Sequence, residues 1–229
     1  MNRGAEYGDR HAFLARATTF AARDAAPNVA HPLPAERAGA DGFVPIGYRT
    51  LTSGLNSLAD DFERNATAVL LEVVRCEAAG LTLDQLAVFV EEHSVRTAVV
   101  SREATAVAAG AQLSELGVDV ADYTPERAVL ADLGVTSPRF GVAATGSLVQ
   151  DSTLEGSRGA SLVPRVHMAV LPVDRIVATT ADVMRAYLLS ATMPTNITFI
   201  TGPSRTGDIE MILTVGVHGP IKVVIALCG

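Results

Sequence analysis

Short apolar runs alternate with helix-length segments along the chain after residue 53. Ser53 can cap a helix that runs to Arg64, and the predicted elements that follow are a strand at 68–74, a helix at 81–92, a strand at 96–100, a helix at 103–116 and a strand at 118–120. Thr82 and Gln85 have capping-box spacing at the start of one helix. Alternation of this kind is typical of parallel βαβ units, which need helices on both faces of their sheet.

The second half of the sequence departs from this alternation. We expect strands at 140–143, 147–150, 167–171, 196–200 and 222–227, a helix from Thr179 or Thr180 to Leu189, and a helix between the turn at Gly202 and about Val215. Hydrophobic residues make up 48% of the chain and aromatic residues 5%. Small branched side chains suit a buried parallel sheet. The prediction is one three-layer α/β domain over residues 48–229, with a β-rich insertion.

Residues 1–47 have a different composition. A helix is predicted from Tyr7 to Arg23, and a segment rich in proline and glycine follows. Irregular segments of this length are uncommon inside compact domains. We expect an N-terminal arm that lies across the body or across a partner subunit, which would make the protein a homo-oligomer.

Charge and cysteine content exclude several classes of protein. The net charge of −7 argues against nucleic-acid binding, which needs a basic face. Cys76 and Cys228 are the two cysteines, too few for an iron–sulfur cluster or a disulfide framework, and His93, His167 and His218 lie at no zinc-finger spacing from them. No metal site is expected. The charged N-terminal residues and the lack of a ~20-residue apolar run predict a cytoplasmic protein with no membrane span.

The run "ITGPSRTGDIE", residues 200–210, is a candidate anion-binding loop. Its candidate ligand-binding residues are Gly202, Pro203, Ser204, Arg205, Thr206 and Asp208. The run is expected to follow a strand of the parallel sheet, at the edge where open α/β proteins bind ligands. If a helix begins here, its first amides and the guanidinium of Arg205 face an anion together. The alternative is that the hydroxyl and carboxylate side chains only cap the helix.

Two further runs carry candidate residues. "AATGSL" offers Thr145, Gly146 and Ser147 as ligand-binding residues, although a tight hairpin turn explains the pattern better. "GVHGP" places His218 and Gly219 before the last strand, where the histidine is either an acid or base or a simple loop residue. His167 is expected to be structural and half-buried, and residues 151–162, with Glu155 and Arg158, to form a surface loop or a lid.

No familiar catalytic signature identifies a reaction. The sequence contains no G-x-G-x-x-G fingerprint, P-loop, G-x-S-x-G elbow or His-Glu-x-x-His motif. Three separated blocks, "FGVAATGSLV", "RGASLVPRVHMAVLPVDRIV" and "ITGPSRTGDIEMILTVGVHGP", nevertheless resemble, in order, those of the LUD domain family of lactate-utilization proteins. The resemblance implies a Rossmann-like open sheet similar to the sugar-phosphate isomerase and coenzyme A transferase group.

The resemblance also implies a role in a three-component system that oxidises L-lactate to pyruvate, with the iron–sulfur clusters in partner proteins and no cofactor in this chain. Residues 145–147, 202–210 and 218–220 match the family's motifs, so Asp208, Glu210 and His218 are the catalytic candidates. Ala144 departs from the glutamate that many relatives carry, which favours an accessory or ligand-binding subunit. The alternative is a stand-alone transferase-like or isomerase-like enzyme, or a sensor, for a small anionic ligand that is phosphorylated, acyl or a hydroxy acid.

Overall fold

The computed structural model describes residues 55–78, 80–151, 153, 157–190, 193–207, 213–215 and 219–229. The predicted arm lies outside these residues. A six-stranded sheet forms the centre, in the order β1 (Glu72–Cys76), β12 (Lys222–Cys228), β7 (Val166–Pro172), β4 (Leu133–Thr136), β2 (Thr97–Val100) and β3 (Asp119–Asp122). Every neighbouring pair is parallel. The predicted parallel α/β architecture is confirmed.

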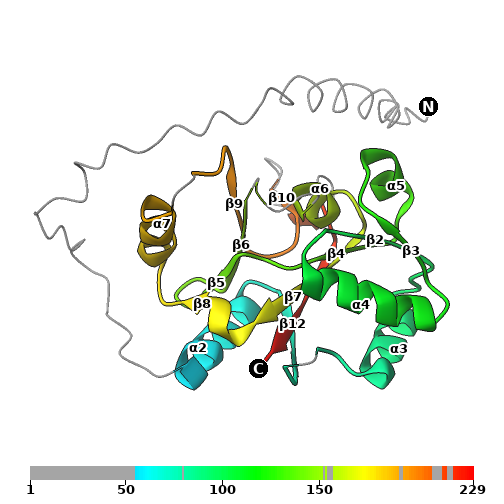
Figure 1. The fold of residues 1–229 in the computed structure, drawn as a ribbon, viewed down its shortest axis with the longest axis horizontal. Coiled ribbons are helices and arrows are strands. Elements are labelled where there is room, and N and C mark those ends of the chain that lie inside the picture. Colours follow the sequence, from blue (N-terminus) through cyan, green and yellow to red (C-terminus); the bar gives the residue numbers. More distant parts are fainter. Residues whose placement is uncertain are drawn as a thin grey trace, which may run out of the picture.

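Helices α3 (Leu83–Glu92) and α4 (Ala104–Glu115) pack together on one face of this sheet (Figure 1). The capping box of Thr82 and Gln85 is present at the start of α3, as predicted. Helix α4 buries small residues, and a Cβ added to Gly110 would lie 2.8 Å from Val100 Cγ1. The lack of a side chain at Gly110 therefore lets α4 lie close to β2.

The opposite face of the sheet carries helix α2 (Leu55–Ala68) and a second sheet (Figure 1). Ala59, Phe62 and Ala66, spaced by one helical turn, form the buried side of α2. The second sheet has the order β8 (Ile176–Val177), β5 (Phe140–Val142), β6 (Ser147–Asp151) and β9 (Ile197–Ile200). The predicted β-rich insertion is thus a separate layer.

Strand β9 corrects one expectation. We predicted that the run at 200–210 follows a strand of the parallel sheet, but β9 pairs antiparallel with β6 in the second sheet. The apolar run of β9 gave no sign of its partner, because pairing is decided by residues that lie far away in the sequence.

The predicted helix up to about Val215 is wrong. The chain forms an antiparallel pair there, β10 (Arg205–Gly207) with β11 (Leu213–Val215), in which Thr206 lies opposite Thr214. β-Branched residues such as Thr214 and Val215 favour extended backbone over helix. No helix start therefore stands behind Ser204, and the helix-dipole part of the anion-binding argument is lost.

Two short helices and a 3-10 turn form further connections between the described strands. Helix α5 (Pro125–Leu130) and strand β4 were not predicted, and helix α6 (Ser157–Leu162) occupies half of the segment that was predicted to be a surface loop or lid. Ala160 and Ser161 of α6 are buried, and a Cβ on Gly134 of β4 would collide with the Ala160 carbonyl. This half of the segment is packed against the sheet and is not a lid. A 3-10 turn, η2 (Val173–Arg175), leads from β7 into β8.

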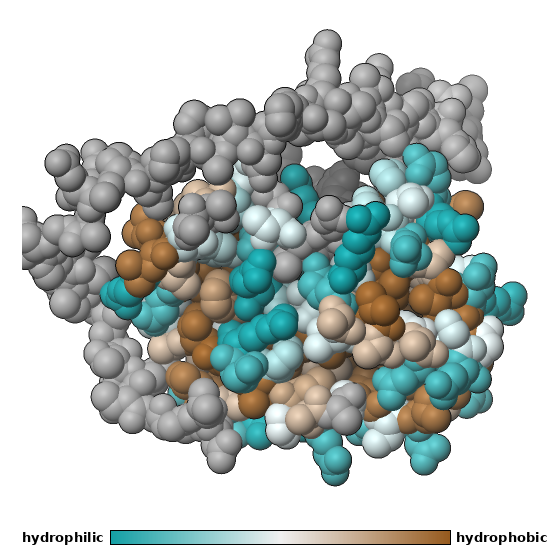
Figure 2. Space-filling view, viewed as in Figure 1, coloured by the Kyte–Doolittle hydropathy of each residue, from teal (hydrophilic) through white to brown (hydrophobic). Residues whose placement is uncertain are grey.

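Helix α7 (Thr180–Leu188) covers the second sheet through Val183 and Tyr187. Figure 2 shows hydrophobic side chains over this helix, where Met184, Leu188 and Leu189 are exposed. Among the described helices, none has both the length and the apolar character that crossing a bilayer requires.

Candidate functional site

Three hydroxyl groups from two of the motif runs form a hydrogen-bonded chain. Ser147 Oγ lies 2.7 Å from Thr145 Oγ1 and 2.7 Å from Thr201 Oγ1. Ser147 is buried, whereas Thr145 and Thr201 are exposed. The chain therefore runs from the interior to the surface on both sides of Ser147, and it joins the β5–β6 turn to the end of β9.

Gly146 stands at the centre of the β5–β6 turn. Its φ is +64°, and a Cβ built on it would lie 2.1 Å from the backbone nitrogen of Ala66 at the end of α2. Asn65 Nδ2 donates to the Ala143 carbonyl at 2.7 Å beside it. The hairpin interpretation of this run is confirmed, and the close approach that glycine allows is made to α2.

The turn at Gly202, where φ is +96°, brings the other two runs together. The amide of Ser204 donates to the Pro220 carbonyl at 3.0 Å, and a Cβ on Gly219 would lie 3.2 Å from Ser204 Cβ. Gly202, Pro203 and Ser204 are all half-buried. The runs at 145–147, 201–204 and 219–220 are thus continuous in space through Thr201 and Ser204. We call these three runs the motif junction.

The remaining candidates lie partly or wholly outside the described residues. Arg205 and Thr206 are described only as backbone in β10. Asp208, Glu210 and His218 lie outside the described residues, as does Glu155. Their proposed roles in binding or acid–base chemistry stay predictions. Ala144 is exposed beside Thr145, and its methyl group supplies no acid there.

A second polar group lies between the two sheets. Gln150 Nε2 donates to Thr136 Oγ1 at 2.7 Å, and Thr136 Oγ1 lies 2.8 Å from His167 Nε2. His167 is fully buried, not half-buried as predicted, and burial lowers its pKa to about 3. Thr136 Oγ1 keeps its own proton and a second lone pair after it accepts from Gln150, so its bond to Nε2 fits either tautomer of the neutral ring. His167 Nδ1 has no partner among the described residues.

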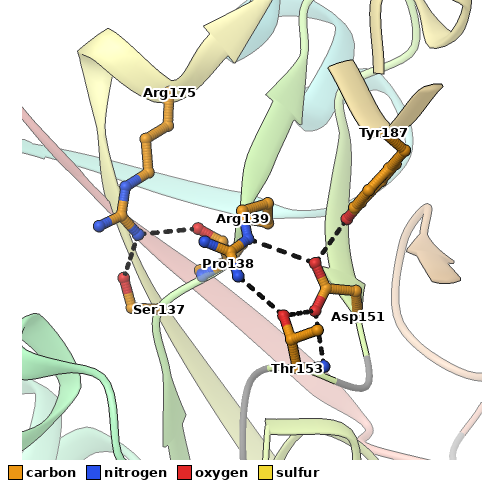
Figure 3. Close-up of polar contacts among 7 residues, drawn as sticks. All are labelled: Ser137, Pro138, Arg139, Asp151, Thr153, Arg175 and Tyr187. Atoms are coloured by element: carbon orange, nitrogen blue, oxygen red, sulfur yellow. Dashed lines mark hydrogen bonds and ion pairs between the residues drawn. The ribbon is translucent and has the colours of Figure 1, made fainter. Parts of the chain in front are cut away.

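A buried carboxylate organises the far end of β6 (Figure 3). Asp151 is 3% exposed and accepts from Tyr187 Oη at 2.7 Å, from the Thr153 amide at 2.8 Å and from Arg139 Nε at 3.2 Å; the Thr153 hydroxyl also donates to it. Burial alone raises the pKa of this carboxyl, but hydrogen bonds from Thr153 and Tyr187 and the charge of Arg139 hold the pKa below its ordinary value.

Arg175 of η2 forms a neighbouring contact (Figure 3). Its Nη1 donates to Ser137 Oγ at 3.0 Å and to the Pro138 carbonyl at 3.1 Å. These two bonds fix the connection between β4 and β5. Four of these residues were not predicted as site residues: Thr201, Asp151, Tyr187 and Arg175. For Asp151 and Arg175, the sequence offered one signal, which is a charged residue next to an apolar strand.

The chemistry of the motif junction follows from its groups. Three hydroxyls donate and accept hydrogen bonds but do not ionise near neutral pH, so they suit binding and orientation of ligand oxygens. In the portion of the chain that the structure describes, no three His, Cys, Asp or Glu side chains are close enough to hold a metal ion. A general acid or base for this junction therefore has to come from outside its described side chains.

The family profile that matches this sequence and the relatives that resemble it agree with one another. The LUD domain profile matches residues 59–228. Lactate utilization protein C from an Exiguobacterium species is 32% identical over 72% of this chain and 75% of its own length. The proteins of the same name from Bacillus subtilis (35% identical, 49% of this chain) and Halalkalibacterium halodurans (39%, 46%) match over about half of their own lengths.

A solved structure shows the same fold. A DUF162 family protein from Deinococcus radiodurans is 21% identical, with a TM-score of 0.55 over 77% of this chain and 99% of that protein. At this identity, the likeness concerns the arrangement of helices and strands. The LUD domain profile, in contrast, matches a range of the sequence that includes the motif junction and the buried networks described above.

Proposed function

Because this chain belongs to the LUD domain family, we propose that it acts as the C component of an L-lactate utilization system that oxidises L-lactate to pyruvate. The observation that supports this most directly is its 32% identity with a lactate utilization protein C over 72% of the chain. Its proposed part is that of an accessory or ligand-binding subunit.

The motif junction is the proposed binding site for a small anionic ligand. Thr145 and Thr201 are exposed hydroxyls held in place by the buried Ser147, so the entropy of ordering them is lost on folding and not on binding. Lactate and pyruvate each carry a carboxylate and a second oxygen that accept such donors. Arg205, next to Ser204 in the sequence, is the proposed source of positive charge.

Iron–sulfur partner proteins are the proposed carriers of the electrons. Oxidation of L-lactate to pyruvate releases two electrons and two protons, which need an acceptor. Cluster ligation generally uses four thiolates, and this sequence contains two cysteines. We therefore expect the clusters to reside in other subunits and this chain to act in contact with them.

Growth on L-lactate tests the proposed role in the cell. A strain that lacks this chain is expected to grow on pyruvate but not on L-lactate as the sole carbon source, and the wild-type chain should restore growth. Ser147→Ala and Thr201→Val should restore it poorly, because each removes one hydroxyl of the junction. Ser114→Ala, which removes an exposed hydroxyl on α4, serves as the control. Normal growth of the deletion strain on L-lactate contradicts the proposal.

Purification separates the accessory role from the stand-alone alternative. Tagged chain from lactate-grown cells is expected to bring down proteins that contain iron and acid-labile sulfide, and the isolated chain to oxidise no L-lactate with an artificial acceptor. Turnover by the isolated chain would instead favour an enzyme. Thermal-shift assays with L-lactate, pyruvate and sugar phosphates identify the ligand, since ligand at a hundred times its Kd adds about 2.7 kcal/mol of stability.

A further inference from the structure

The two cysteines lie side by side at the carboxyl ends of neighbouring strands. Cys76 of β1 is in register with Cys228 of β12, and their sulfur atoms are 2.9 Å apart although the residues are 152 positions apart in the sequence. Neighbouring strands are spaced ~4.8 Å apart, which falls within the Cα separation of ~4.4–6.8 Å found in disulfides. Both residues are free thiols in the structure.

A small cavity is lined in part by one of these cysteines. Its volume is about 60 Å³, and the lining includes Cys228, Thr105 and Gln112, with the exposed Ala78 and Ala108 at its rim. A cavity of roughly 10–15 Å³ is enough to hold one water molecule, so this cavity has room for a molecule as small as hydrogen peroxide. Thr105, which also lines the cavity, has a buried hydroxyl oxygen with no hydrogen-bond partner among the described residues.

The thiols differ in their tendency to ionise. The hydrogen bond from Cys76 lowers the pKa of Cys228, although burial opposes this effect, and the same bond raises the pKa of Cys76. The thiolate is the nucleophilic form of cysteine. Cys228, which lines the cavity, is therefore the better nucleophile, and Cys76 is the thiol that lies next to it.

We propose that Cys76 and Cys228 form a dithiol–disulfide couple that hydrogen peroxide oxidises and that small dithiols reduce. The Cys228 thiolate attacks a peroxide oxygen, an S–O bond forms, the O–O bond breaks and water leaves after protonation. Cys76 then attacks the Cys228 sulfur, an S–S bond forms, and the sulfenic oxygen leaves as a second water. The two thiols lose two electrons and two protons in total, and the peroxide is reduced to water.

Peptide mapping of the oxidised protein tests the couple. Full-length reduced protein is treated with a few equivalents of hydrogen peroxide, alkylated and cleaved with trypsin without reductant. Arg75 and Lys222 are cleavage sites, so the expected product joins the peptide Cys76–Arg96 to the peptide that begins at Val223. The two thiols should disappear together, the protein should stay monomeric on a denaturing non-reducing gel, and dithiothreitol should restore both.

Single variants test which thiol reacts first. In Cys76→Ser, Cys228 should stop at the sulfenic acid and be trapped by dimedone. In Cys228→Ser, the rate of thiol loss should fall at least several-fold. The proposal is overturned if the wild-type protein keeps both thiols, forms only intermolecular disulfides, or is oxidised to sulfinic acids without the linked peptides. The wild-type mapping decides the matter even if a variant fails to fold.

Discussion

The hydroxyl of Tyr187 donates a 2.7 Å hydrogen bond to Asp151, and this contact fixes α7 to the end of β6. Both side chains are buried. The ring of Phe140 packs edge-to-face against the tyrosine ring, and the two ring centroids are 5.9 Å apart. The bond lies at one end of the second sheet, whereas the motif junction lies at the other end of β6, at Ser147. Strand β6 thus connects the hydrogen bonds around Asp151 to the motif junction at Ser147.

Replacing Tyr187 with phenylalanine should destabilise the protein by about 1–3 kcal/mol, because a buried carboxylate loses one of its donors while the ring packing stays. Urea unfolding followed by circular dichroism measures the change. Tyr123→Phe is the matched control: Tyr123 is also partly buried, but its hydroxyl makes no hydrogen bond to another described residue. Equal losses in the two variants would show that the contact with Asp151 adds nothing.

Acid should weaken the protein through Asp151. The folded pKa of this carboxyl lies below its ordinary value of ~3.9, so its stabilising contribution is present above about pH 4 and is lost as the pH falls through the folded pKa. Asp151→Asn should therefore be less stable than wild type at pH 7 and should show a smaller decrease in unfolding free energy from pH 5 to pH 2. Asp174→Asn, which removes an exposed carboxylate, is the control for the loss of one negative charge.

His167 should make the protein sensitive to mild acid. It is buried and neutral with a pKa of about 3, whereas in the unfolded chain it takes up a proton near pH ~6.5. Because the folded pKa is below the unfolded value, the unfolded chain binds a proton first as the pH falls. The contribution of His167 to the free energy of unfolding is therefore complete at neutral pH and is lost at lower pH. Between pH 7 and pH 5 this loss amounts to about 2 kcal/mol. His167→Gln should remove that part of the pH dependence, and identical slopes for variant and wild type would rule out His167 as its source.

The β5–β6 turn should not tolerate a side chain at Gly146. In Gly146→Ala, a methyl group meets the backbone of Ala66 and φ stays positive, so we expect a loss of more than ~2 kcal/mol. Gly117→Ala separates the strain of a positive φ from the steric clash. Gly117 also has a positive φ, of +82°, but nothing lies within 4 Å of a Cβ added to it. That control should lose only ~1 kcal/mol. Thermal and urea unfolding of both variants measures the difference, and equal losses would mean that the turn moves away from α2.

The first βα units were predictable because their signals are local. Leu86 and Phe89 recur at helical spacing after a capping box, and Val99 and Val100 stand in a short apolar run. The strand "LGVT" at 133–136 was missed since four residues with a central glycine give a weak pattern. Its place in the sheet depends on β2 and β7, which contact it from distant parts of the sequence.

The site was predictable in part. Thr145, Ser147 and Ser204 were identified by motif, and the structure brings their runs together. Thr201 was missed because its importance comes from Ser147, 54 positions earlier. The predicted helix after Ser204 failed because serine and threonine before apolar residues occur both at helix starts and in hairpins. Pairing of β10 with β11 decides between these two, and pairing is not visible in either segment alone.

The position of β12 has a consequence for biosynthesis. It comes after every other described strand in the sequence, yet it lies between β1 and β7, and its residues pack into the cores on both faces of the sheet. Strand β1 has no other neighbour in this sheet, so it must wait unpaired while about 150 further residues are translated. Until residues 222–228 have left the ribosome, the nascent chain therefore keeps the apolar edge of β7 exposed and β1 without a partner, and chaperone binding is most needed in that interval.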